Sequence, residues 1–254
     1  AVIHFGVDGH NDALMILLVG LALLAAVRER HELALPLVTA AALVKFVPAI
    51  LVPLFLLAAR RSPRQAGAGL AASLALAAAA FAPQWAGLDT FDGVRDQGSR
   101  QTSSLATVLT FAFDSEDLAR ALMVGTFAAG YAYIILRVRG LVPQTFALLS
   151  LYLATVAFWF KGWYVTWPLM FGAALGGPAL AVAAVWSVGP LIAPVFGAWG
   201  WLMYWWDWHR RWGIWMMETW LTASLLAPLA AGLLGVAGWR WLRLIRRGVQ
   251  APPP

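Results

Sequence analysis

The sequence predicts an all-α fold, a polytopic bundle of transmembrane helices with broken or re-entrant helices and a polar outer loop. Hydrophobic residues make up 61% of the 254 residues and charged residues 12%, with a mean hydropathy of +0.74. A soluble domain contains roughly 45–50% apolar and about 25% charged residues. The apolar runs are long and lack the alternation of membrane strands, which favours helices over a barrel.

Eight apolar runs predict the individual helices. A helix needs about 20 residues to cross the hydrocarbon core of a bilayer, and several runs reach that length. The run at 165–175 is short, so we expect a tilted or broken helix there. The runs cover residues 11–27, 33–59, 66–81, 118–136, 141–160, 165–175, 178–198 and 214–239.

The run at 33–59 is interrupted by "VKFVPAILVP", where Lys45, Pro48 and Pro53 predict a kink or a pair of half-helices. Basic residues predict the orientation, because cytoplasmic loops are enriched in Lys and Arg. We place eleven of the 18 basic residues in the cytoplasm, which puts both ends of 33–59 inside and Lys45 near the tip of a re-entrant hairpin. These residues are Arg28, Arg30, Arg60, Arg61, Arg64, Arg137, Arg139, Arg240, Arg243, Arg246 and Arg247.

The chain is thus divided into a membrane domain, 1–239, and a cytoplasmic basic and proline-containing tail, 240–254. The outer side receives residues 1–11, the loop at 83–117 and two Trp-rich segments. Ten of the 12 acidic residues lie there or at the outer interface, more than orientation requires, so we expect polar chemistry on that face. The Trp-rich stretch at 199–220 is either an interfacial aromatic belt or a platform for a sugar or isoprenoid.

The net charge of +6 does not indicate nucleic acid, because the basic residues stand at the ends of apolar runs. The chain has no cysteine, which excludes disulfides and thiolate metal sites. It begins at Ala1 and enters an apolar run within about ten residues. We expect a C-terminal fragment; removal of an initial Met before alanine is the alternative.

Three polar stretches are candidates for chemistry. In "GHNDALM", Asn11 and Asp12 suit a helix cap and first turn; alternatively His10 and the exposed N–H groups bind phosphate. Lys45 either snorkels to the surface or faces the same outer cavity as His10, where a cation suits a lipid phosphate. "FDGVRDQGSRQTSSLATVL" is either a solvated loop with a Ser/Thr cap before a short helix or a substrate loop. In the second case Arg95 and Arg100 hold phosphate, and polar side chains read sugar hydroxyls: Gln101, Thr102, Ser103 and Ser104.

Together with "WYVTWPLMFGAAL", these stretches resemble the later part of bacterial GT-C-type glycosyltransferases, above all the polyprenyl-phosphate-mannose-dependent mannosyltransferases, over about residues 1–175. The resemblance implies a multi-pass enzyme of the bacterial cytoplasmic membrane whose active site faces outward. It would move a hexose, taken as mannose, from a polyprenyl-phosphate carrier to a lipid-linked or cell-envelope glycan acceptor, without a nucleotide. Some relatives use a divalent metal, but no ligand set here demands one, so no cofactor is expected.

The resemblance also implies site residues. His10, Asn11 and Asp12 match an "HND" signature, and Lys45 matches the lysine that closes the next half-helix. His10 and Lys45 would hold the donor phosphate, and Asp12 would contact the acceptor hydroxyl or organise the site, which makes His10 and Asp12 the predicted catalytic residues. The family's usual base is an aspartate in an earlier outer loop, and the match places it upstream of Ala1, so activity of this chain alone does not follow. The polar loop contributes Arg95, Ser103 and Ser104, and the aromatic corner contributes Trp163, Tyr164 and Trp167.

Two other classes share some of these features. A transporter or lipid flippase would also bury ions, but should show inverted repeats with matched breaks. A structural or assembly protein of the membrane would need no role for "GHND". The asymmetry of the acids and the set of motifs favour the enzyme.

Overall fold

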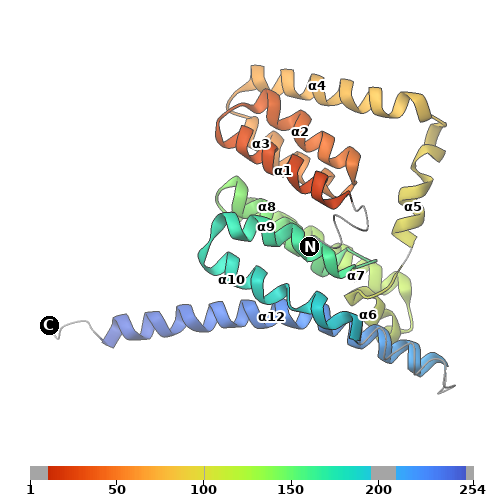
Figure 1. Ribbon diagram of the computed structural model, residues 1–254, viewed down its shortest axis with the longest axis vertical. Coiled ribbons are helices and arrows are strands. Elements are labelled where there is room, and N and C mark those ends of the chain that lie inside the picture. Colours follow the sequence, from red (N-terminus) through yellow and green to blue (C-terminus); the bar gives the residue numbers. More distant parts are fainter. Residues whose placement is uncertain (1–10, 100, 196–209, 250–254) are drawn as a thin grey trace.

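The computed structural model describes residues 11–99, 101–195 and 210–249, and in these ranges it is built of helices (Figure 1). Its strand-like pairing there is an isolated parallel bridge between Thr102 and Trp159. Among the described residues, four helical segments are long and apolar enough to cross a membrane: Pro63–Gln84, Glu116–Arg137, Gly177–Val195 and Trp215–Trp239. The all-α membrane fold predicted from composition is therefore confirmed.

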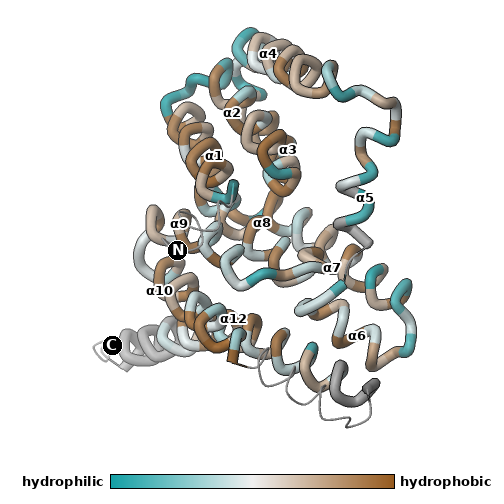
Figure 2. The backbone as a smooth tube through the Cα atoms, turned by 45° about the vertical axis from the view of Figure 1, so that its right-hand side comes forward, coloured by the Kyte–Doolittle hydropathy of each residue, from teal (hydrophilic) through white to brown (hydrophobic). Residues whose placement is uncertain are grey.

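The first layer contains α1 (Asp12–Val27), α2 (His31–Val44), η2 (Val47–Leu51), α3 (Val52–Ala59) and α4 (Pro63–Phe81). Figure 1 shows α4 as the outermost helix of this layer, next to α2, and Figure 2 shows α1 and α3 as strongly apolar. The α2 and α4 helices approach closely, since a Cβ added to Gly69 would lie 2.7 Å from the carbonyl oxygen of His31.

The predicted break at Lys45 is confirmed. Lys45 has an extended backbone, with φ −156° and ψ 129°, and ends α2. Pro48 and Pro53 then occupy the first turns of η2 and α3, where a missing N–H costs little. The N–H of His31 donates to the side chain of Gln65 (3.4 Å), so α2 and α4 begin at the same end. The α2–α3 pair is thus a hairpin with Lys45 at its tip.

The stretch predicted as a polar outer loop consists largely of short helices: η3 (Ala82–Gln84), η4 (Gly87–Phe91), α5 (Asp92–Ser99) and α6 (Leu105–Phe113). Figure 2 shows α5 as mostly hydrophilic, and Figure 1 shows it linking α4 to the second layer.

The second layer contains α7 (Glu116–Arg137), α8 (Leu141–Thr155), η5 (Gly162–Val165), α9 (Thr166–Leu175), α10 (Gly177–Trp186) and α12 (Arg210–Val249). One predicted bound was wrong. The run at 141–160 ends as a helix at Thr155, and the irregular segment that follows places aromatic side chains beside the site. The run at 178–198 contains a turn at 187–188, and its described part, Gly177–Val195, is one candidate span. The α12 helix continues through residue 239 to Val249 (Figure 1), while the Trp-rich residues 199–209 lie outside the described ranges.

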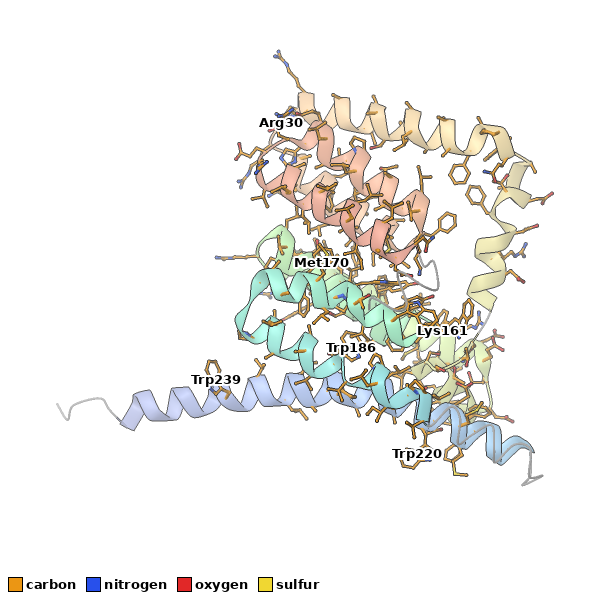
Figure 3. All side chains as sticks on the ribbon, in the orientation of Figure 1. Arg30, Lys161, Met170, Trp186, Trp220 and Trp239 are labelled. Atoms are coloured by element: carbon orange, nitrogen blue, oxygen red, sulfur yellow. The ribbon has the colours of Figure 1, made fainter. Side chains whose placement is uncertain are left out.

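The two layers meet along α1, α8 and α9. Met170 of α9 lies at this boundary (Figure 3), where its Cε would be 3.1 Å from a Cβ added to Gly20 of α1. The largest fully buried side chains include Trp167, Trp186 and Phe55. Because the first turn of α1, the tip of the α2–α3 hairpin and the start of α9 lie close together, their polar groups form one site.

Candidate active site

Asp12 is the centre of a buried polar cluster. It is the first residue of α1 and is fully buried, with 0% of its surface exposed. Its Oδ1 accepts hydrogen bonds from Lys45 Nζ (2.7 Å) and from Trp167 Nε1 (2.7 Å). Its Oδ2 is buried without a hydrogen-bond partner among the described residues. One carboxylate therefore joins α1 to the hairpin tip and to α9.

Lys45 is held on several sides. Its ammonium pairs with Asp12 and lies 4.3 Å from the ring centroid of Tyr164 and 4.9 Å from that of Trp167. These two rings stack on each other with centroids 4.4 Å apart. Asn11 Nδ2 donates to the carbonyl of Val44 (2.8 Å), which fixes the end of α2 beside the cluster. The cation is thus placed by an ion pair and by two aromatic faces.

Burial shifts the pKa of Lys45 and the pKa of Tyr164 in opposite directions. Burial lowers the pKa of Lys45, and the hydrogen bond and charge of Asp12 oppose that change. Burial, with the charge of Asp12, raises the pKa of Tyr164 to about 12. Tyr164 therefore stays a neutral phenol through the physiological range.

A pocket of about 670 Å³ opens beside this cluster. Lys45, Asn11, Tyr164 and Trp167 supply its polar and aromatic groups, and Thr90 and Gly93 border it from the segment of η4 and α5. Its volume is in the range that holds a small-molecule or cofactor-sized ligand. The remaining lining is apolar or aromatic: Val44, Phe46, Val47, Ile50, Tyr152, Val156, Ala157, Phe158 and Trp159.

The described residues include no group of three or more His, Asp and Glu side chains that could hold a metal ion. The chemistry that the cluster itself offers is one paired cation beside an apolar cavity. Such an arrangement can bind the anionic head of an otherwise apolar ligand.

The family model of glycosyltransferase family 87 matches residues 6–162 of the chain. The chain belongs to glycosyltransferase family 87. Neither the curated proteins nor the solved structures include a match to it. With four candidate membrane spans in the part of it that the structure describes, the chain is a membrane glycosyltransferase, which favours the enzyme over the transporter and assembly-protein alternatives.

The family 87 match contains α1 and the hairpin with Lys45, but Tyr164 and Trp167 lie beyond its end. The structure brings Asn11, Asp12, Lys45, Tyr164 and Trp167 together, although 155 residues separate Asp12 from Trp167. Trp163 extends this group, with its ring edge-on to Tyr164 at 5.9 Å.

Other predicted site residues of this glycosyltransferase lie elsewhere. Arg95 is exposed on α5 and lines a separate hollow with Asp92, Gly93 and Asp96, although Gly93 borders both cavities. Ser104 is buried and caps α6 by accepting a hydrogen bond from the N–H of Thr107, which agrees with the alternative interpretation of a cap before a short helix. The predicted residues His10 and Arg100 lie outside the described ranges.

The backbone N–H of Ser103 donates to the carboxylate of Glu218, so this predicted sugar-contacting residue is engaged within the protein. Sequence reasoning did not select Glu218 or the pocket residues Tyr152, Phe158 and Trp159. Tyr152 stands inside an apolar run, and Phe158 and Trp159 stand in what was predicted to be its last turn, so no local pattern distinguished them. The one available signal for Glu218 was an acidic residue inside an apolar helix.

Proposed function

We propose that this family 87 enzyme transfers a hexose, taken as mannose, from a polyprenyl-phosphate carrier to a lipid-linked or cell-envelope glycan acceptor. The reaction would take place at the outer face of the bacterial cytoplasmic membrane. The observation that carries the proposal is the Lys45 cation, fixed by Asp12 and two aromatic rings at the border of a largely apolar pocket. A lipid phosphate combines the negative charge and the apolar chain that such a pocket favours.

The proposed reaction follows from the charge that develops on the leaving group. The acceptor oxygen bonds to the anomeric carbon, the bond from that carbon to the phosphate oxygen breaks, and the polyprenyl phosphate leaves with the electron pair. Charge on the phosphate rises in the transition state, so a cation held in place beforehand stabilises it. Lys45 is such a cation, and the apolar lining accommodates the first isoprenoid units.

The proton of the acceptor hydroxyl passes to a base. Asp12 Oδ1 already accepts two hydrogen bonds and the residue is fully buried, so its contacts support a role in organising the site more than a role as the base. His10 remains the second predicted catalytic residue. Aromatic side chains, with Tyr164 and Trp159 among them, offer faces against which a sugar ring packs.

The test uses membranes that hold the full-length protein, a radiolabelled polyprenyl-phosphate mannose donor, and envelope lipids as acceptor. Removing one preorganised donor that stabilises developing negative charge costs roughly 10²–10³ in kcat, and we expect that loss for Lys45→Met. Lys45→Arg should retain part of the activity because it keeps the charge. Arg61→Met, at the exposed far end of the bundle, is the control and should keep full activity.

Two results would refute the proposal. One is a Lys45→Met enzyme that transfers as well as the control. The other is a wild-type enzyme that uses a nucleotide sugar in preference to the lipid-linked donor. Polyprenyl-phosphate glucose in parallel assays tests whether mannose is the hexose.

A further inference from the structure

Glu218 of α12 binds the loop that precedes α6. Glu218 is 8% exposed, and its Oε1 accepts a hydrogen bond from Thr102 Oγ1 (2.6 Å). The other carboxylate oxygen accepts from the backbone N–H of Ser103. Ser103 has a φ of +53°, an unusual value for a residue with a side chain. The carboxylate thus holds a short, sharply turned segment from the far end of the chain.

The same segment pairs with one wall of the pocket. The N–H of Thr102 donates to the carbonyl of Phe158 (2.9 Å), and the N–H of Phe160 donates back to the carbonyl of Thr102 (3.3 Å). Phe158 and Trp159 line the pocket beside Lys45. The contacts therefore run without a gap from Glu218 through Thr102 to the pocket wall.

Glu218 also acts on the pocket wall through the charge of Lys161. The Lys161 ammonium lies 4.6 Å from the ring centroid of Trp159, and Lys161 is half-buried directly before η5, near the start of α9 (Figure 3). Burial lowers the pKa of Lys161, and the negative charge of Glu218 opposes this change. Glu218 therefore favours the charged form of the lysine that contacts Trp159.

We propose that Glu218 is a positioning residue, which holds the pocket wall of Phe158 and Trp159 in place through Thr102 and Ser103. A buried carboxylate is costly unless hydrogen bonds compensate it, and here its partners belong to the segment paired with the wall. Glu218 lies outside the part of the chain that matches family 87. The inference rests on the proposed function only where transfer is measured.

The variants separate this role from general stability. Glu218→Met keeps the approximate length but removes the carboxylate that accepts from the hydroxyl of Thr102 and the N–H of Ser103. Glu218→Gln can accept from Ser103 and donate to Thr102, so it keeps both hydrogen bonds while losing the charge. Glu29→Met replaces an exposed acid at the opposite end and is the control.

The chain has no cysteine, so single cysteines report local opening without background. Ala157→Cys lies in the pocket wall and is 5% exposed, whereas Ala34→Cys lies in α2, is 1% exposed and reports global unfolding. We expect Glu218→Met to raise the maleimide labelling rate at 157 about tenfold or more without changing the rate at 34. The labelling rate at 157 in Glu218→Gln should lie between the rates in Glu218→Met and in the wild type, and the rate in the Glu29→Met control should match the wild type.

An unchanged rate at 157, or a parallel rise at 34 and 157, would overturn the inference. Labelling needs no transferase activity, so it tests the role of Glu218 even if the proposed donor is wrong. If the donor is the polyprenyl-phosphate sugar, Glu218→Met should also raise its KM several-fold while kcat changes less. A fall in kcat with an unchanged KM would contradict a positioning role.

Discussion

Replacing Asp12 by Asn tests the central contact of the site. The carboxamide keeps the shape and can still accept the hydrogen bonds from Lys45 and Trp167 at one oxygen. It removes the negative charge, and Lys45 is then a half-buried cation without a counter-ion. Its side chain is 22% exposed, whereas that of Asp12 is 0% exposed.

The magnitude follows from these exposures. Breaking a buried ion pair by removing one partner costs about 3–5 kcal/mol, and the partial exposure of Lys45 favours the lower end, near 3 kcal/mol. For a chain of this size, 1 kcal/mol shifts the melting temperature by roughly 2–4 °C. Asp12→Asn should therefore lower the Tm by roughly 6–12 °C.

The assay is thermal melting of the detergent-solubilised chain, with a second ion pair as the control. Glu116 and Arg120 are separated by 2.6 Å, but their side chains are 54% and 25% exposed, and exposed pairs are worth about 0–1 kcal/mol. Glu116→Gln should thus melt close to the wild type. Lys45→Met added to Asp12→Asn removes the isolated cation and should recover part of the lost stability, while transfer stays as low as in Lys45→Met.

Two outcomes would refute the reasoning. The first is an Asp12→Asn protein that melts within the range of the Glu116→Gln control. The second is a double variant whose loss equals the sum of the two single losses, because contacting residues should show a coupling of about 0.5–3 kcal/mol.

Four further predictions follow from the structure. Donor binding should be lost as the pH rises, with a midpoint below the ordinary lysine pKa of 10.5, because burial lowers the pKa of Lys45 and only its charged form binds phosphate. Lys45→Arg should extend binding to higher pH, and the same titration midpoint for both proteins would contradict this prediction. Gly69→Ala should lower the Tm, since its Cβ would meet a backbone oxygen at 2.7 Å, whereas Gly67→Ala, with nothing within 4 Å, should preserve or raise it; equal melts would contradict the packing. Trp167→Phe should lower the free energy of unfolding by about 1–3 kcal/mol, because Asp12 loses a hydrogen-bond donor. An unchanged melting temperature would show that this hydrogen bond is unimportant. In intact cells, an impermeant maleimide should label a cysteine at 89 but not at 29, and the reverse pattern would invert the proposed orientation.

The sequence alone predicted much of the fold because its signals are local. The length and composition of apolar runs define membrane helices, and Lys45 with Pro48 and Pro53 marked the break in 33–59 that the structure contains. The distribution of arginines placed both ends of that run on one side, and the hairpin has that form. The end of α8 at Thr155 was missed, because an apolar sequence continues through the irregular segment that follows.

The site was predicted only in part, because its decisive contacts join residues far apart in the chain. Lys45 was expected to face the cavity at the start of α1. Its pairing with Asp12, and the contacts that Asp12 and Lys45 each make with Trp167, depend on how the two layers pack. Ser104 shows the converse case. A serine before an apolar run is equally consistent with a cap or a substrate contact, and the hydrogen bond with Thr107 corresponds to the cap.

The charge balance of the site indicates that a bound phosphate needs a second cation. Asp12 and Lys45 form a pair with no net charge, so a lipid phosphodiester bound beside them would bring an uncompensated negative charge into a largely apolar pocket. Such a charge is costly at low dielectric unless a second cation or further donors meet it. Lys45 alone therefore orients the phosphate more than it neutralises it. The proposed function requires a second positive group at the mouth of the pocket, and the sequence offers His10 just before α1 and Arg95 two residues after Gly93, which borders the pocket.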